Sequence, residues 1–577
     1  MPTSLYQGMI QPLVIGVTSH RNLVGAEIGR VRSETRDFFL RLRSDFPALP
    51  LTVVSALAAG GDQLVAEEAL ALGARLVAPL PLPREIYARD FTDPAVRERF
   101  EALCARATVL EPPPVDADIL DGVADDRRTR DWHYAQSGIY LASHCHILLV
   151  LWDGKPSTLP GGTAQVVDYY LTGRKPALVE RRRSACGENR IDDNNQRLAY
   201  HVVCSRDDAD GAPAEPLLPL QTFWRAGDEA VAGTEAMPPA FRAMFARMVE
   251  LNADCAKYAA RIEAAARDVS RRPVVAGAFA TRSPIERSFA AADWLALHNQ
   301  RRVLVAMRAM YTLAALMGIA FMLYHVLAQD YMIFVFLAVF ASGVTLDLVA
   351  KRRDWHRKYL DYRALAEGLR VQAYWRRADL SMTGDAEFAH DNFLQKQDID
   401  IGWIRNVMRA AALDAASAAA RDADLGGVID EWVGESGRFG QLHYYERRLE
   451  ERTRTHRLTR RIGAISLWVG IAISVFLAVF VFRLPHGVQN MLVSIMAVLS
   501  IIAAVREAYA YRKADKELIK QYRFMRRIFA NARAALDRTG DPVEQREILR
   551  ALGEAALAEH AEWTLMHRER SLERARM

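Results

Sequence analysis

Two pairs of long apolar stretches constrain the fold of this chain more than any other feature. Each stretch has about 19–20 residues, enough for one helix to cross roughly 30 Å of hydrocarbon. The first pair is Met310–Ala328 and Tyr331–Val349, joined by Gln329-Asp330, and the second is Ile462–Phe482 and Gly487–Val505, joined across Arg483–His486. The sequence therefore predicts two transmembrane hairpins and four spans. The alternative is two pairs of buried core helices.

Basic residues flank the apolar stretches at one end of both hairpins. These flanks are Arg301-Arg302, Lys351–Arg353, Arg460-Arg461, and Arg506 with Arg512-Lys513. Because lysine and arginine accumulate on the cytoplasmic side of membrane proteins, all large polar regions are expected there. The prediction is a multi-pass protein of the inner (plasma) membrane whose N-terminal domain and C-terminus are both cytoplasmic.

The hairpins resemble each other at a spacing of 160 residues. Asp347 matches Glu507, and the pair Tyr362-Arg363 matches Tyr522-Arg523, which favours a duplication. Asp347 and Glu507 fall at the cytoplasmic ends of spans two and four and are candidate residues of a cation-selective pore mouth. The alternative is an interfacial acid paired with a neighbouring Lys or Arg. Four spans enclose little, so a pore requires a homo-oligomer.

The N-terminal region alternates strand and helix patterns. Continuous apolar strands are expected at 12–17, 51–55, 74–79, 146–151 and 201–205, and helices at 27–43, 62–72 and from 162. Such alternation predicts an α/β domain with a parallel sheet covered on both faces.

Small and polar residues follow three of these strands. In a parallel sheet, the loops at the carboxyl ends of the strands share one edge, where ligands bind. Glycines there allow close backbone approach, and helix starts attract anions. The sequence predicts a phosphate- and ribose-binding cleft, and the alternative is that the glycines serve only caps and turns. The candidate ligand-binding residues are Gly16, Thr18, His20, Arg21, Ser55, Gly60, Asp62, Asp153, Lys155, Gly161, Gly162 and Thr163.

The motifs GVTSHR, SALAAGGDQLVAEEAL, PLPREIYARDF and LWDGKPSTLPGGTAQVV resemble the SLOG family of Rossmann-like nucleotide-binding domains over about residues 10–230. The resemblance implies a Rossmann-like fold and a nucleotide-derived ligand. It implies that this ligand is surrounded by Gly16, Thr18, Arg21, Gly60, Asp62, Gly161, Gly162 and Thr163.

The paired hairpins with their trailing Tyr-Arg helices resemble the SLATT family of membrane effectors of bacterial conflict systems. Together the two resemblances imply a sensor of a nucleotide second messenger that gates or assembles a membrane pore in antiphage defence. A cyclic nucleotide and an ADP-ribose derivative are both open as ligands. Membrane lipid, further copies of the chain and a separately encoded signal synthase are the expected partners, and no cofactor is expected.

One departure bears on catalysis. Related phosphoribohydrolases carry PGGxGTxxE, whose Glu assists cleavage, whereas this chain has Val166 at that position and Asp168 on another side of the helix. Binding is therefore favoured over turnover, and the alternative is a membrane-anchored nucleotide or nucleoside hydrolase. His144 and His146 are expected to share one face of a strand, without the ligand cluster of a metal site. Tyr134 and its aromatic neighbours could stack on a base or pack under the sheet.

Composition bears on nucleic-acid binding and on the redox compartment of the protein. Lys+Arg 75 against Asp+Glu 70 leaves a net charge of +5 over 577 residues, which gives no argument for nucleic-acid binding. The five cysteines are scattered, as is typical of a reducing compartment. The predicted plan is a nucleotide-binding domain at 1–230, a helical linker at 231–302, the first hairpin with its trailing helix at 303–377, a helical connector at 378–455, and the second hairpin with the C-terminal helices at 456–577.

Overall fold

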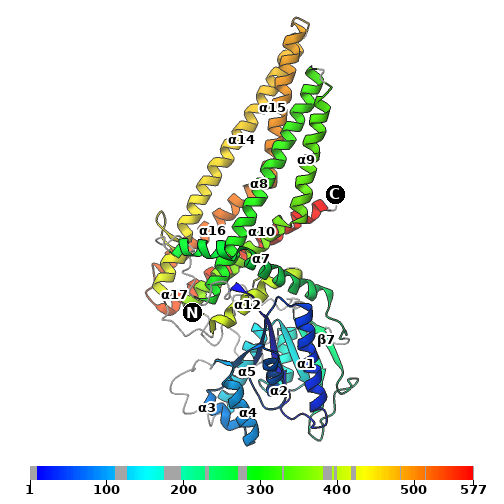
Figure 1. Cartoon of the computed structure of the whole chain (residues 1–577). Coiled ribbons are helices and arrows are strands. Elements are labelled where there is room, and N and C mark those ends of the chain that lie inside the picture. Colours follow the sequence, from blue (N-terminus) through cyan, green and yellow to red (C-terminus); the bar gives the residue numbers. More distant parts are fainter. Residues whose placement is uncertain are drawn as a thin grey trace.

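The computed structural model has a sheet domain at one end and four long helices at the other, with shorter helices between them (Figure 1). The structure describes residues 9–110, 127–173, 197–227, 233–270, 283–327, 330–380, 393–394, 399–416, 424–480, 482–513 and 515–575. Cys186 and Gln329 lie outside these residues.

The sheet has seven strands in the order β4-β3-β2-β1-β5-β6-β7. Six strands are parallel, and β7 pairs antiparallel with β6. The chain builds one half of the sheet outward from β1 and then returns to build the other half from β5. The order therefore reverses between β1 and β5. The strands are β1 (Leu13–Ser19), β2 (Leu51–Ser55), β3 (Arg75–Pro79), β4 (Thr108–Leu110), β5 (Ile147–Trp152), β6 (Leu198–Val203) and β7 (Thr222–Ala226).

Helices cover both faces of this sheet, as the continuous apolar strands predict. Val14 and Leu148 belong to one buried cluster with α5 (Arg127–His144) and α6 (Thr163–Thr172). Ile15 and Leu149 belong to a second cluster with residues of the helices on the other face. Those helices are α1 (Ile28–Asp45), α2 (Gly61–Ala71) and α4 (Pro94–Cys104), with the short α3 (Arg84–Tyr87) and the 3-10 turn η2 (Ala88–Asp90) between α2 and α4. The α/β prediction is confirmed at this level.

Four helices are long and apolar enough to cross a membrane: α8 (Pro284–Leu327), α9 (Met332–Arg352), α14 (Gly440–Phe480) and α15 (His486–Lys513). None of the apolar window of α9 or α15 is buried within the chain. Helix α8 packs against α9 and α15, and α14 packs against α15. Since α8 and α14 are continuous helices, the domain boundaries expected at 302/303 and 455/456 fall inside helices.

The trailing helices match at the spacing found in the sequence. Helix α10 (Trp355–Arg377) begins 160 residues before α16 (Asp515–Leu536). Each of them packs against the first helix of its own hairpin, α10 on α8 and α16 on α14. The two hairpins therefore share one architecture, in agreement with a duplication.

A helical body connects the sheet to the long helices. It contains α7 (Pro239–Ser270), η4 (Ile399–Ile401), α12 (Trp403–Ala416), α13 (Leu425–Val428), the π-helix η5 (Ile429–Val433) and α17 (Pro542–Ala575). It meets the sheet at the amino ends of three strands, just before or at β1, β5 and β3. The contacts are the Gln11 backbone N–H to Asn252 Oδ1 at 2.8 Å, His146 Nε2 with the Asn406 carbonyl at 2.8 Å, and an Arg75–Asp414 ion pair. The carboxyl edge of the sheet thus lies at the end of the strands away from the helical body.

Candidate functional site

The three loops singled out in the sequence come together at the carboxyl edge of the sheet. Thr163 donates its hydroxyl to the carbonyl of Ser19 at 2.8 Å, which joins the start of α6 to the end of β1. The backbone N–H of Gly61 donates to the carbonyl of His20 at 3.2 Å, which joins the start of α2 to the same place. This is the point where the strand order reverses, the usual ligand position in such sheets.

The glycines after β2 approach the protein's own chain. A Cβ added at Gly60, whose φ is +81°, would lie 2.1 Å from the carbonyl oxygen of Arg21. One added at Gly61 would lie 2.6 Å from Cβ of Ser19. These residues are glycines because the loop packs against the end of β1, so no ligand is needed to explain them.

Gly16 and Thr18 lie within β1 rather than in the loop beyond it. A Cβ at Gly16 would lie 2.9 Å from the side chain of Cys145, at the end of α5. Thr18 is buried and pairs with Val150 of β5. Gly16 therefore serves the packing of α5 on the sheet.

Asp62 is a buried carboxyl group that ties two strands together. Its carboxylate accepts hydrogen bonds from the hydroxyls of Ser19 at 2.6 Å and Ser55 at 3.2 Å. Burial raises the pKa of Asp62 to about 6, although these hydrogen bonds act in the opposite direction. Asp62 and Ser55 therefore have each other as hydrogen-bond partners.

Asp153 is the centre of a second polar network, which uses three of the predicted polar groups. Its Oδ1 lies 3.1 Å from Nε2 of His20, and its Oδ2 accepts from Nε of Arg206 at 2.7 Å. Burial lowers the pKa of His20 despite the neighbouring Asp153. Lys155 donates its Nζ to Oδ1 of Asp210 at 2.7 Å. His20, Asp153 and Lys155 therefore have partners within the chain.

Arg21 is different from these groups. Arg21 is an exposed residue, and its guanidinium lies over the ring of Tyr134, 5.7 Å from the ring centroid. Among the described residues, no carboxylate forms an ion pair with it. Tyr134 is held by its hydroxyl, which donates to Asp90 at 2.5 Å, and Asp90 also pairs with Arg130 at 2.6 Å. A positive charge held over an aromatic ring at the switch point can bind an anion.

Gly161 and Gly162 place the start of α6 beside this arginine–tyrosine pair. Gly161 has a φ of +67°, and a Cβ there would lie 2.6 Å from the backbone carbon of Tyr134. Its N–H donates to Oε1 of Gln165 at 2.6 Å. The positive end of the α6 dipole thus lies near Arg21.

Several residues of this edge were missed from the sequence. Arg130 lies on α5, and Arg206 and Asp210 lie beyond β6, so their sequence separation from the loops gave no signal. Tyr134 was identified only as an aromatic residue that could stack or pack. Val166 is buried, and a Cβ at Gly138 of α5 would lie 2.8 Å from it, while Asp168 is exposed. Neither position supplies a carboxyl group at the edge.

The expectation for the two histidines before β5 was wrong in one respect. His144 ends α5, so it does not share a strand with His146. Its Nδ1 lies 2.8 Å from the carbonyl of Tyr140. Burial lowers the pKa of His144 to about 4 and that of His146 to about 3. The described residues contain no group of three or more His, Cys, Asp or Glu side chains placed for a metal ion.

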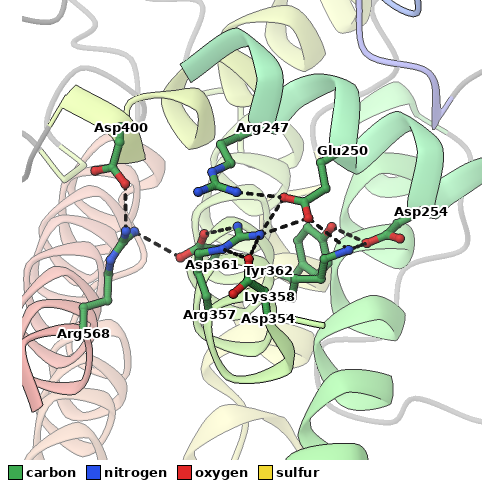
Figure 2. Close-up of polar contacts among 10 residues, drawn as sticks. All are labelled: Arg247, Glu250, Asp254, Asp354, Arg357, Lys358, Asp361, Tyr362, Asp400 and Arg568. Carbon is green, nitrogen blue, oxygen red and sulfur yellow. Dashed lines mark hydrogen bonds and ion pairs between the residues drawn. The ribbon is translucent and has the colours of Figure 1, made fainter. Parts of the chain in front are cut away.

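A charged junction joins the sheet-docking helix α7 to α10, the helix that follows span two (Figure 2). Glu250 accepts from Arg357 at 2.8 Å, and Asp254 accepts from Lys358 at 2.6 Å and from the Tyr362 hydroxyl at 2.7 Å. The network continues from Arg357 to Asp361 at 3.3 Å. Arg568 of α17 then donates to Asp361 at 3.1 Å and to Asp400 of η4 at 3.0 Å.

The same turn of α7 also holds the sheet. Asn252, between Glu250 and Asp254, donates to the carbonyl of Gln11 at 2.9 Å and to that of Ala48 at 3.0 Å. Position 252 is about 200° around the helix from position 250. One face of this turn of α7 therefore contacts the sheet domain, and the opposite face contacts α10. A displacement of the sheet domain would therefore act directly on α10.

The two candidate pore acids each have a basic neighbour. Asp347 lies 2.8 Å from Nζ of Lys351, one turn further along α9. Glu507 accepts from Arg506 at 2.6 Å. These contacts agree with the interfacial pairing that was the alternative to a pore mouth.

The chain matches no protein-family model, no curated protein and no solved structure.

Proposed function

We propose that this protein is a bacterial inner-membrane effector. In this proposal a SLOG-like, Rossmann-like domain binds a nucleotide-derived second messenger. Binding gates or assembles a pore made by the SLATT-like hairpins of several copies, in antiphage defence. The observation that carries the proposal is Arg21: a guanidinium free of carboxylate partners among the described residues, at the carboxyl edge of the sheet.

The chemistry of this edge suits an anionic ring-bearing ligand. A guanidinium binds phosphate through parallel hydrogen bonds, and the positive end of the dipole of α6 attracts the same negative charge. Tyr134 and Arg21 also offer flat surfaces on which a base could stack. Because His20 and Lys155 have partners in the chain, Arg21 supplies most of the charge available to a phosphate.

The arrangement of the long helices favours assembly. Helix α8 contacts α9 and α15, and α15 contacts α14, so the four helices form a row in which α8 and α15 are central. Large apolar residues are exposed on all four, including Phe334 at 70 %, Trp468 at 68 % and Ile495 at 41 %. A row has no lumen. A pore therefore requires several chains, and lipid covers the remaining apolar surface.

Helix α5 offers a route from the ligand edge to the helical body. Its 18 residues span roughly 27 Å. Tyr134, in its first half, contacts Gly161 at the carboxyl edge, whereas Leu141 and Ala142 of its last turn belong to the same buried cluster as Ala410 and Leu413 of α12. A shift of α5 would move α12, which is bonded to His146, and then the junction between α7 and α10.

Calorimetry of the purified full chain against a panel of cyclic nucleotides and ADP-ribose derivatives tests the binding step. A charge-assisted contact contributes roughly 1.5–3 kcal/mol, so Arg21→Ala should lower the affinity about ten- to a hundred-fold. Lys155→Ala is the matched control, because that ammonium is paired with Asp210. Binding that is weakened equally by both changes, or by neither, would contradict the assignment of Arg21.

A further inference from the structure

The second hairpin carries exposed basic residues next to its apolar stretches. Arg454, Arg457, Arg460 and Arg461 on α14 and Lys516 on α16 are all exposed, and none of them forms an ion pair with a described residue. We call these five residues the basic collar. Arg454, Arg457 and Arg461 follow one another at helical spacing, so they share one side of α14.

The collar lies at the depth of lipid headgroups. A Cβ at Gly463 would lie 3.0 Å from the side chain of Arg506, so the apolar stretch of α14 begins at the level where that of α15 ends. Arg454, the residue of the collar on α14 farthest from Ile462, precedes it by about 12 Å along the helix axis. The headgroup layer is roughly 5–7 Å thick and the Debye length is about 8–10 Å. Every arginine of the collar is therefore within reach of the charged surface.

Four of the five equivalent positions of the first hairpin carry no Lys or Arg; the exception is Arg301. The residues 160 positions earlier are Trp294, Leu297, Gln300, Arg301 and His356. Trp294 packs against Tyr258 of α7 at a centroid distance of 5.3 Å, and Gln300 donates to the Tyr359 hydroxyl at 3.1 Å. The first hairpin thus uses this surface for packing within the helical body. Orientation alone does not explain the collar, since Arg460-Arg461 already form a basic flank of this hairpin and Arg454, Arg457 and Lys516 add to it.

We propose that the basic collar binds the phosphate headgroups of anionic lipids in the leaflet that faces the sheet domain. Clustered arginines bind phosphates through charge-assisted, bidentate hydrogen bonds, and a basic cluster beside a transmembrane helix attracts anionic lipid. The division of roles follows from the duplication: the first hairpin is attached to the sheet domain and the second to the lipid surface. This proposal rests on the proposed membrane crossing, but not on the ligand of the sheet edge.

The test uses the full chain in phosphatidylcholine vesicles containing spin-labelled phosphatidylglycerol or spin-labelled phosphatidylcholine. The motionally restricted fraction of each probe gives the relative association constant. The fourfold variant Arg454→Gln, Arg457→Gln, Arg460→Gln and Arg461→Gln should lower the preference for phosphatidylglycerol by about fivefold or more. The matched control replaces Lys520, Arg523, Arg526 and Arg527 by Gln; these residues are also exposed and basic, but lie farther along α16 from the apolar stretches.

Each outcome is decisive. A lower preference in the collar variant and an unchanged one in the control supports headgroup contact. An unchanged preference in the collar variant overturns the inference. An equal fall in both variants also overturns it, because long-range charge would then explain the effect. Flotation of the wild-type vesicles is measured in parallel, and a chain that does not float with lipid would contradict the membrane crossing itself.

Discussion

Gly161 and Gly162 were equivalent in the sequence, but the structure distinguishes them. Gly161 has a positive φ and lies against the Tyr134 backbone. Gly162 has a φ of −71°, and a Cβ added there would lie 3.1 Å from its nearest neighbour, the carbonyl oxygen of Leu159. We expect Gly161→Ala to destabilise this edge by about 1–3 kcal/mol and Gly162→Ala by less. Hydrogen exchange of the amides in α6 would measure both. Equal protection in the two variants would contradict the close contact with Tyr134.

Asp62 makes the stability of the sheet domain depend on pH. Its folded pKa, about 6, lies above the ordinary value of 3.8, so the folded state holds the proton more tightly. Its contribution is complete below about pH 4 and is lost as the pH rises through 6, by roughly 3 kcal/mol in all. The variant Asp62→Asn lacks this pH-dependent contribution to the free energy of unfolding. We therefore expect melting curves at pH 5 and pH 8 to differ less in the variant than in the wild type. A difference of the same size in both would place the ionisation elsewhere.

The sequence located the loops of the site but not the partners of their side chains. The ends of the apolar runs predicted strand ends at 17, 55 and 151, within two residues of the observed ends Ser19, Ser55 and Trp152. A Gly-Gly pair indicates that a side chain does not fit at these positions, but it does not show whether a ligand or another part of the chain occupies the space next to the backbone. Likewise, His20 and Lys155 were expected to face a ligand. Their partners, Asp153 for His20 and Asp210 for Lys155, lie far along the sequence from them, and only the fold brings them near.

At the scale of elements, long patterns were predictable and short ones were not. The boundaries of β2 were predicted without error, and those of α2 to within a residue. The three-residue β4 and the half-exposed antiparallel β7 were missed, because neither has a continuous apolar run. Helix α8 extends far beyond its apolar stretch because its polar half packs in the helical body, whereas in the polar half of α14 only the first turns, around Leu442 and Tyr445, are buried there.

The junction between α7 and α10 gives a prediction at this scale. Glu250 and Arg357 are partly exposed, so we expect a coupling free energy of about 0.5–2 kcal/mol from a double-mutant cycle of Glu250→Gln and Arg357→Gln. Arg448→Gln with Glu451→Gln, an exposed pair within α14, is the control and should couple less. Urea unfolding of the detergent-solubilised chain measures the four free energies. Additive effects at Glu250 and Arg357 would show that the pair does not connect the helices.

Acid should weaken the same junction. Burial would raise the pKa of Glu250, but Arg357 and Lys358 outweigh it and hold that pKa below its ordinary range. The group therefore stabilises the fold above its unfolded pKa, and this contribution is lost only as the pH falls through the lower folded value.

At the scale of the whole molecule, the ligand edge and the membrane helices lie at opposite ends of the strands (Figure 1). A ligand at Arg21 cannot touch α8 or α15, so any effect on them must pass through the sheet domain. Helix α5 and the turn of α7 around Asn252 both connect this domain with the helical body. A ligand can act through them only by binding one arrangement more tightly than another.

Vesicle leakage is the most direct test of this account. The full chain, reconstituted in dye-loaded vesicles, should release dye when one nucleotide of the panel is added, and that nucleotide should be recovered intact by chromatography. Arg21→Ala should shift the leakage to higher nucleotide concentration, whereas Lys155→Ala should not. Conversion of the nucleotide without leakage at any concentration would contradict the account and identify a membrane-anchored hydrolase instead.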